Sequence, residues 1–283
     1  MPSPVTFLDL TPGDIPAGLR LSRQSGWNQT EADWRALLLA PSVFRGARIG
    51  DTIVGTAGAV VYGDRLAWVC MVLVDQTERG RGLGTNLVNQ VLQRLPAGAV
   101  VGLDATPKGL AVYERLGFQG GGSLHRLETT SPATPAGSSP RVRAMTEADL
   151  PRVLQRDQEV FGADRGRVLR GALAAAPEYA WCFEDGGALV AYGFGRAGHN
   201  ADQIGPVVAL DISAAVDIVA GSLRARPGHP FFLDASPRSE WRQALASRGF
   251  REQRGFTRMY RGGRSLVPAG EEQCLAIFGP EFG

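Results

Sequence analysis

The same phrase occurs twice in the chain, as LDATPKGLAVYERLGF at residues 103–118 and as LDASPRSEWRQALASRGF at residues 233–250. Each copy predicts a strand that ends at Leu-Asp-Ala. A Thr-Pro or Ser-Pro pair then predicts the start of a helix, with the hydroxyl as its cap and proline at its first position. Gly117 and Gly249 predict the end of that helix, because glycine tolerates the left-handed conformation, and a phenylalanine then begins another strand. The repetition predicts a duplicated unit of mixed α/β structure.

Other parts of the two halves align in the same order. FLDLTPGDIP at 7–16 parallels RVRAMTEADLP at 141–151, and each predicts a short strand, a threonine N-cap and a helix. Apolar and β-branched runs broken by glycine predict partly buried strands, and longer runs with helical spacing predict helices. Strands are expected at 52–64, 66–74, 98–105, 188–196, 203–210 and 229–235, and helices at 85–95 and 213–225.

A linker is predicted between the halves. The segment TTSPATPAGSSP at 129–140 has three prolines and no large apolar residue, so it has little to bury. It separates a first domain at 1–128 from a second at 141–283, each of ordinary domain size. The tail LAIFGPEFG at 275–283 is expected to pack against the second domain.

Composition narrows the function classes. The formal net charge of the 283 residues is only +2, which indicates neither nucleic acid nor an anionic membrane as a partner. No apolar run reaches transmembrane length, and a cytoplasmic location is expected by elimination. Cys70, Cys182 and Cys274 are isolated from one another and from the three histidines, which argues against a disulfide framework and against a metal site.

The two halves differ most in one stretch, ERGRGLGT at 78–85, which lies between an expected strand and an expected helix. Its three glycines allow a sharp turn with unobstructed amides, and a helix N-terminus adds partial positive charge. The stretch therefore predicts a diphosphate site, although a glycine-rich turn that binds nothing has the same pattern. A dinucleotide-binding loop would need another glycine where Thr85 stands, and it would follow the first strand of its unit.

The pattern Arg79-x-x-Gly82-x-Gly84 resembles the pyrophosphate-binding motif of the GNAT N-acetyltransferase superfamily. The resemblance extends from residue 68 to residue 118 in the expected order, and the doubled layout is similar to a two-domain bacterial branch called YitH-like. It implies two tandem GNAT-like domains, each with a mostly antiparallel central sheet flanked by helices. It also implies acetyl-CoA as co-substrate, no metal, and direct attack of an amine on the thioester without a covalent enzyme intermediate.

The resemblance also assigns roles to particular residues. Backbone groups of Val72 and Val74 would pair with the pantetheine arm of acetyl-CoA, and Tyr113 would donate a proton to the departing thiolate; the alternative for Tyr113 is a packed tyrosine with a satisfied hydroxyl. The general base is not identified. The diphosphate would be held by the loop residues Arg79, Gly80, Arg81, Gly82, Leu83, Gly84 and Thr85.

The acceptor side is expected to involve Trp27, Asn28 and Tyr62, with packing as the alternative for each. Packing is the preferred interpretation for Trp34 and Trp68. Asp104 ends a strand near the expected site, but its counterpart Asp234 lies in the half without the glycine loop. A structural role, such as capping the following helix, is therefore favoured for both aspartates.

The second half has DISAAVDIV at 211–219 where the first half has its glycine loop, so it is expected to be a degenerate GNAT-like domain. Within 193–209, Arg196, His199, Asp202 and Gln203 form either part of an acceptor pocket or an exposed polar hairpin. The leading hypothesis is acetyl transfer to a primary amine of a small molecule. The alternatives are a non-catalytic acetyl-CoA-binding regulatory protein and a protein lysine acetyltransferase, in a monomer or a homodimer.

Overall fold

The computed structural model describes residues 4–130, 141–263 and 270–283. The strands are β1 Val5–Asp9, β2 Ser42–Ile49, β3 Thr52–Tyr62, β4 Leu66–Val74, β5 Val100–Ala105, β6 Gln119–Thr129, β7 Val142–Ala144, β8 Trp181–Asp185, β9 Ala188–Arg196, β10 Asp202–Ala209, β11 Phe231–Ala235, β12 Arg251–Arg261 and β13 Cys274–Ala276. The α-helices are α1 Ile15–Gln24, α2 Glu31–Leu39, α3 Leu83–Leu92, α4 Leu110–Arg115, α5 Leu150–Phe161, α6 Gly166–Ala175, α7 Ile212–Ala225 and α8 Ser239–Ala246.

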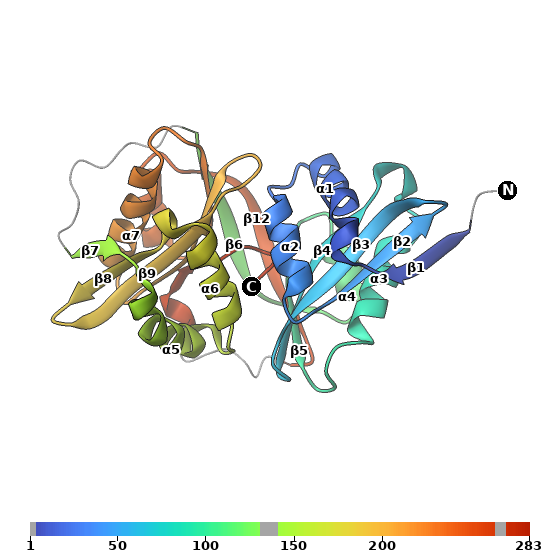
Figure 1. Ribbon diagram of the computed structural model, residues 1–283, viewed down its shortest axis with the longest axis horizontal. Helices are drawn as coiled ribbons and strands as arrows, with labels where there is room; N and C mark the ends of the chain where they lie inside the picture. Colours follow the sequence, from blue (N-terminus) through green and yellow to red (C-terminus); the bar gives the residue numbers. More distant parts are fainter. Residues whose placement is uncertain (1–3, 131–140, 264–269) are drawn as a thin grey trace.

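All the strands of the described chain form one continuous sheet, in the order β1-β2-β3-β4-β5-β12-β6-β11-β13-β10-β9-β8-β7. Neighbouring strands are antiparallel except for β4 with β5 and β10 with β11. Helices flank the sheet, and the first and second halves of the chain occupy its two ends (Figure 1). The prediction of a mixed α/β fold with a mostly antiparallel sheet is confirmed.

The centre of the sheet is built from strands that the two halves exchange. β12, from the second half, pairs with β5 of the first half, and β6, from the first half, pairs with β11 of the second. β6 and β12 also pair with each other along most of their length, where they run side by side in Figure 1. In each half, the strand that follows the last helix is therefore paired with a strand of the other half.

Two equivalent ion pairs hold the exchanged strands in place. Arg258 of β12 donates two hydrogen bonds to Asp104 of β5, both at 2.9 Å. Arg126 of β6 donates two to Asp234 of β11, at 2.8 and 2.7 Å. The two arginines occupy matching positions in the repeat, and so do the two aspartates. The predicted structural role of Asp104 and Asp234 is thus confirmed, but the suggested helix cap is wrong because both carboxylates are committed to guanidinium groups.

The signals for helix starts and ends are confirmed at most of the positions compared, and one is wrong. Thr11 and Thr146 form capping boxes with Asp14 and Asp149, as the threonine signals indicated. The glycines at the ends of α4 and α8 have positive φ angles of 84° and 87°. The predicted helix start at Thr-Pro is wrong, because the Thr106 carbonyl accepts from the Gly109 amide at 2.9 Å and closes a turn before α4.

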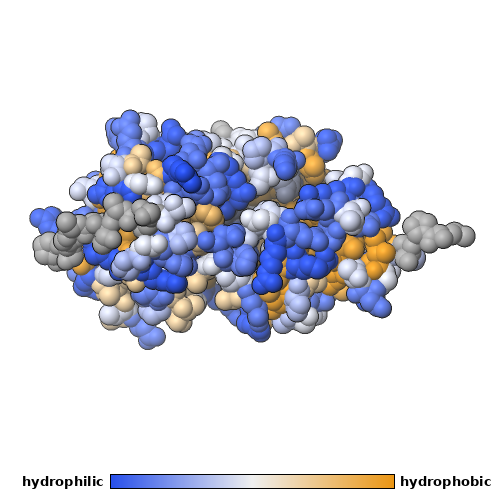
Figure 2. Space-filling model, turned by 90° about the horizontal axis from the view of Figure 1, so that it is seen from above, coloured by the Kyte–Doolittle hydropathy of each residue, from blue (hydrophilic) through white to orange (hydrophobic). Residues whose placement is uncertain are grey.

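The hydrophobic core also joins the two halves. One cluster combines Trp34 of α2 and Trp68 of β4 with Leu169 of α6, and the exposed fraction of each is 2% or less, so the packing expected for both tryptophans is confirmed. The face in Figure 2 is mainly hydrophilic, with hydrophobic residues gathered toward the end that carries the N-terminus. No helix of the described residues is long and apolar enough to cross a membrane. The predicted linker starts inside β6 at Thr129, and residues 131–140 lie outside the described part of the chain.

Candidate active site

A cleft opens where β4 and β5 separate. These parallel strands pair only at Leu66–Trp68 with Val100–Gly102, and the rest of β4 leaves β5. A bulge against β3 lies in this part of β4, and it contains Met71 with a φ of 52° in the left-handed region. The Thr56 hydroxyl donates to the Met71 carbonyl at 2.8 Å and holds the bulge. The backbone from Cys70 to Val74 thus forms one wall of the opening, and it includes Val72 and Val74.

The glycine loop meets this wall at the N-terminus of α3. Gly80 and Gly82 have φ angles of 79° and 75°, which side-chain-bearing residues rarely adopt, and Gly82 is the N-cap without any side-chain cap. The first amides of α3 have no intrahelical acceptor, so they are available to an anion. A Cβ on Gly84 would stand 3.5 Å from Val74 and 4.0 Å from Val72, which are ordinary contact distances, so the start of α3 lies directly against β4.

The two arginines of the loop are placed differently. Arg79 lines the cleft and donates through Nε to the Val74 carbonyl at 3.1 Å. Arg81 forms an ion pair with Glu78 and is not among the described residues that line the cleft. Only one of the predicted arginine contacts is therefore brought to the site.

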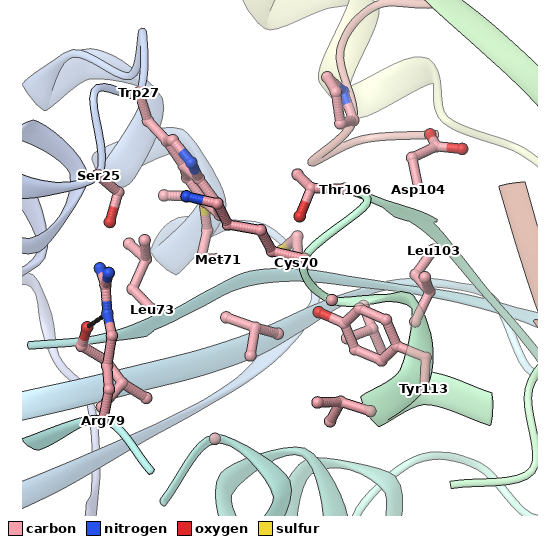
Figure 3. A pocket seen from close by; sticks show the side chains of 18 of the residues that line it. Ser25, Trp27, Cys70, Met71, Leu73, Arg79, Leu103, Asp104, Thr106 and Tyr113 are labelled. Carbon is pink, nitrogen blue, oxygen red and sulfur yellow. Dashed lines mark hydrogen bonds between the residues drawn. The ribbon is translucent and has the colours of Figure 1, made fainter. Parts of the chain in front are cut away.

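One cavity of about 940 Å³ joins the glycine loop, β4 and α4. Tyr113 of α4 enters it from the side opposite Ser25 and Trp27, with its hydroxyl directed into the space (Figure 3). The Tyr113 ring packs edge-on against Phe118 at a centroid distance of 6.0 Å. Burial raises the pKa of Tyr113, so the phenol is neutral and can donate a proton.

Two other ionisable groups on the cavity wall have restricted chemistry. Burial raises the pKa of the Cys70 thiol well above its ordinary value, with a smaller effect of Glu281, so this cysteine is a protonated and weak nucleophile. Burial also raises the pKa of Asp104, whereas the charge and hydrogen bonds of Arg258 oppose that shift. Asp104 is thus held by its ion pair and is not a free base.

The three residues predicted for the acceptor side are placed unequally. Trp27 lines the cavity (Figure 3). Asn28 also lines it, but its side chain accepts from the Asn200 and Ala201 amides and donates to the Ala201 carbonyl, so it mainly clamps the β9–β10 loop. Tyr62 is not brought to the cavity: its hydroxyl donates to the Phe282 carbonyl at 2.7 Å and its ring packs on Phe161.

The corresponding cleft of the second half is closed. β10 and β11 pair at Asp202–Ile204 and then separate like β4 and β5, but β13 lies between them and pairs with both. The N-terminus of α7 is capped by the Asp211 carboxylate, which accepts from the Ala214 amide at 2.8 Å. A strand and an anionic cap of the chain itself thus occupy the places that are open in the first half.

The tail after β13 crosses to the first half and closes one end of the cavity. The Trp68 indole donates to the Pro280 carbonyl at 3.0 Å, and both Pro280 and Glu281 line the cavity. β12 contributes Arg254 and Phe256 to the same end. Sequence reasoning missed these four residues, because no motif marks them and their position depends on the strand exchange. The predicted packing of the tail on the second domain is confirmed, because the Ile277 amide donates to the Asp234 carbonyl at 3.1 Å and Arg165 donates to the Gly283 carbonyl at 3.1 Å, but the prediction missed the contact with the first half.

The hairpin at 193–209 supports the closed end of the cavity, but its described residues do not line the cavity. Arg196 is buried and bonded to Asp33 and Glu281, and Gln203 donates to Asp234 at 3.0 Å. Asp202 accepts from the Tyr179 hydroxyl, and the His199 amide donates to the Asn28 carbonyl at 2.8 Å. These four residues form neither the predicted acceptor pocket nor the predicted exposed hairpin. The side chains of Arg196, Asp202 and Gln203 are instead committed to hydrogen bonds within the protein.

The geometry of the cavity fits one class of ligand. A splayed strand pair suits an extended arm with amide groups, and an uncapped helix N-terminus behind a glycine loop suits a diphosphate. Comparison with known proteins agrees. The profile described as Acetyltransferase (GNAT) family matches residues 16–118, and that described as Acetyltransferase (GNAT) domain matches 153–274. The chain belongs to the GNAT family, and acetyl transfer from acetyl-CoA is the activity that this membership assigns to it.

Individual relatives match most of the length of the chain. The uncharacterized N-acetyltransferase YitH of Bacillus subtilis is 26% identical over 236 residues, which cover 82% of this chain and 83% of that protein. A putative acetyltransferase from Pyrococcus horikoshii superposes with a TM-score of 0.82 at 19% identity, covering 99% of this chain and 96% of the other. A tandem GNAT protein from the clavulanic acid biosynthesis pathway has a TM-score of 0.62 at 15% identity, covering 92% and 99%. The two structural neighbours support the fold alone.

Proposed function

We propose that this protein acetylates a primary amine of a small molecule by direct attack on acetyl-CoA, in the cavity of the first half. The observation that carries the proposal is that the glycine loop, the splayed part of β4 and Tyr113 all line one cavity of about 940 Å³. Within it, the amides from Gly80 to Thr85 hold the diphosphate, Arg79 adds a positive charge, and backbone groups of Val72 and Val74 pair with the pantetheine arm.

Overall, the nitrogen of the acceptor, which starts as an ammonium ion, loses two protons in the reaction. An ammonium ion loses one proton to solvent before it attacks, because only the neutral amine has a free electron pair. The C–N bond then forms and the C–S bond breaks. Tyr113 gives its phenolic proton to the sulfur and is reprotonated by the second proton from nitrogen. Amides of β4 polarise the thioester carbonyl during the attack. The protonated state of Cys70 supports direct attack over an acetyl-cysteine intermediate.

Calorimetric titration with acetyl-CoA tests the cofactor site. The variant Arg79→Ala/Gly82→Asp is expected to lose micromolar binding, because it removes the cleft-lining charge and places a carboxylate at the anion site. The matched control is Arg81→Ala, since Arg81 is turned to Glu78. Retention of binding in the double variant, or equal loss in the control, would contradict the assignment of the diphosphate to this loop.

An amine screen that follows free-thiol release tests the chemistry. Turnover of small primary amines, lost in Tyr113→Phe while acetyl-CoA still binds, is the expected result. Binding without turnover of any amine would indicate a regulatory acetyl-CoA-binding protein instead.

A further inference from the structure

The end of the cavity that the tail and β12 close, here called the acceptor end, holds a buried cluster with excess negative charge. Arg196 donates to both Asp33 and Glu281, so two carboxylates share one guanidinium. Glu281 is 3% exposed and lines the cavity, and its Oε2 has no hydrogen-bond partner among the described residues. The side-chain oxygen of Gln29, which also lines the cavity, is likewise buried without a partner in the described chain. Unpaired buried acceptors are costly, and a cationic donor would satisfy them.

A second cluster at the same end has excess positive charge. Arg254 of β12 and Arg126 of β6 are direct cross-strand partners, an arrangement that is unfavourable for like charges. Asp234 neutralises Arg126. Among the described residues, Arg251 and Arg258 of β12 form ion pairs with carboxylates, and Arg254 forms none. The Nε of Arg254 is buried without a partner in that part of the chain, and its guanidinium stands 5.0 Å from the centre of the Phe256 ring.

The two clusters are electrostatic neighbours. Burial acts to lower the pKa of Arg126, whereas the charges of Asp234 and Glu281 raise it, and Arg196 opposes them. Burial and the charge of Arg126 lower the pKa of Arg254 to about 10, so it remains charged at neutral pH. Glu281, Arg126 and Arg254 also line the same cavity. A negative site and a positive site therefore face one space.

We propose that the acceptor carries both a primary amine and an anionic group, with Glu281 as the counter-ion of its amine end and Arg254 as the ligand of its anion. This inference rests on the proposed function and deepens it, because it names the substrate class. Both residues come from the second half, through the exchanged strand β12 and the tail. The half with the closed cleft thus selects the acceptor for the half with the open one.

The test compares ω-amino carboxylates of increasing chain length with the n-alkylamines of the same length, at saturating acetyl-CoA. For the best chain length, kcat/KM is expected to be about 10- to 100-fold higher with the carboxylate, as for a charge-assisted hydrogen bond. Arg254→Met is expected to abolish this advantage, whereas Arg251→Met, on the exposed part of the same strand, retains it. Glu281→Gln is expected to raise KM for the amine about tenfold, and Glu271→Gln, at an exposed position that does not line the cavity, is its control.

Binding of the same compounds to the CoA-saturated protein, measured by calorimetry, separates the two proposals. If alkylamines and amino carboxylates are acetylated equally well, the inference fails and the proposed function stands. If no amine is acetylated but amino carboxylates bind and Arg254→Met abolishes that binding, the proposed function fails and the acceptor site stands. If Arg254→Met weakens acetyl-CoA binding and leaves acceptor selectivity intact, the guanidinium serves the cofactor and the inference is wrong.

Discussion

Breaking the ion pair between Asp104 and Arg258 should destabilise this protein strongly. The Asp104 carboxylate is fully buried, and the Arg258 side chain is 14% exposed. The guanidinium carbon also stands 4.6 Å above the Trp68 ring. Asp104→Ala removes the only carboxylate bonded to Arg258 among the described residues, and it leaves a buried positive charge at the joint between the halves.

The expected loss of unfolding free energy for Asp104→Ala is about 3–5 kcal/mol, because the partner charge stays buried without compensation. Arg258→Met should cost a similar amount at pH 7. That cost should shrink as the pH falls, since burial already raises the pKa of Asp104 and the unpaired carboxyl can protonate. The double variant Asp104→Ala/Arg258→Met should cost clearly less than the sum of the two single variants, because neither buried charge is then left without its partner.

Urea unfolding followed by tryptophan fluorescence and circular dichroism measures all four proteins of this cycle. The reasoning is refuted if both single substitutions cost less than about 1 kcal/mol and their effects add in the double variant. The equivalent cycle on Arg126 and Asp234 should give the same pattern, since the geometry is repeated there.

Four further outcomes are expected. Tyr113→Phe should lower kcat by about 10²–10⁴-fold with an unchanged acetyl-CoA Kd, and an unchanged kcat would remove the tyrosine from the mechanism. Gly82→Ala, at a φ of 75°, should weaken acetyl-CoA binding about tenfold by straining the loop, whereas the same change at the open helical position Gly171 should not. The hydrogen bond from Arg20 lowers the pKa of Asp75 to about 2, so its stabilisation is complete above about pH 5 and lost toward pH 2; an unfolding series should show the deficit of Arg20→Gln, about 1 kcal/mol, vanishing over that range. Residues 1–130 expressed alone should aggregate and recover solubility only with 141–283, and a soluble isolated half would contradict the interlocked sheet.

Local features were predictable because their signals lie close together in the sequence. The glycine loop, the strand before it and the capping boxes each need only a few neighbouring residues. The exchange of β6 and β12 was not predictable by the same means, because the repeat places an identical Leu-Asp-Ala edge in both halves. Arg126 could equally have faced Asp104 or Asp234, and only the global packing decides. A repeated arginine matched to a repeated aspartate was nevertheless a signal for a pair.

The acceptor end was hidden for a related reason. Glu281 and Arg254 stand in stretches without any motif, far along the chain from the glycine loop. Their position follows from β12 entering the first half and from the tail crossing it, which are both long-range events. Of the two aromatic residues expected on the acceptor side, Trp27 lies at the cavity and Tyr62 lies in the core. The sequence alone could not distinguish these two positions.

The strand exchange also has a consequence for the order in which the chain is made. At a synthesis rate of about 5–20 residues per second, roughly 8 to 30 s pass between the appearance of the end of β5 at Ala105 and that of β12 at Arg261. During that time the edge of β5 has no permanent neighbour, and the acceptor end of the cavity does not yet exist. A ribosome-bound intermediate would therefore be able to hold the cofactor loop but not the complete site, which forms only after β12 and Glu281 have left the ribosome.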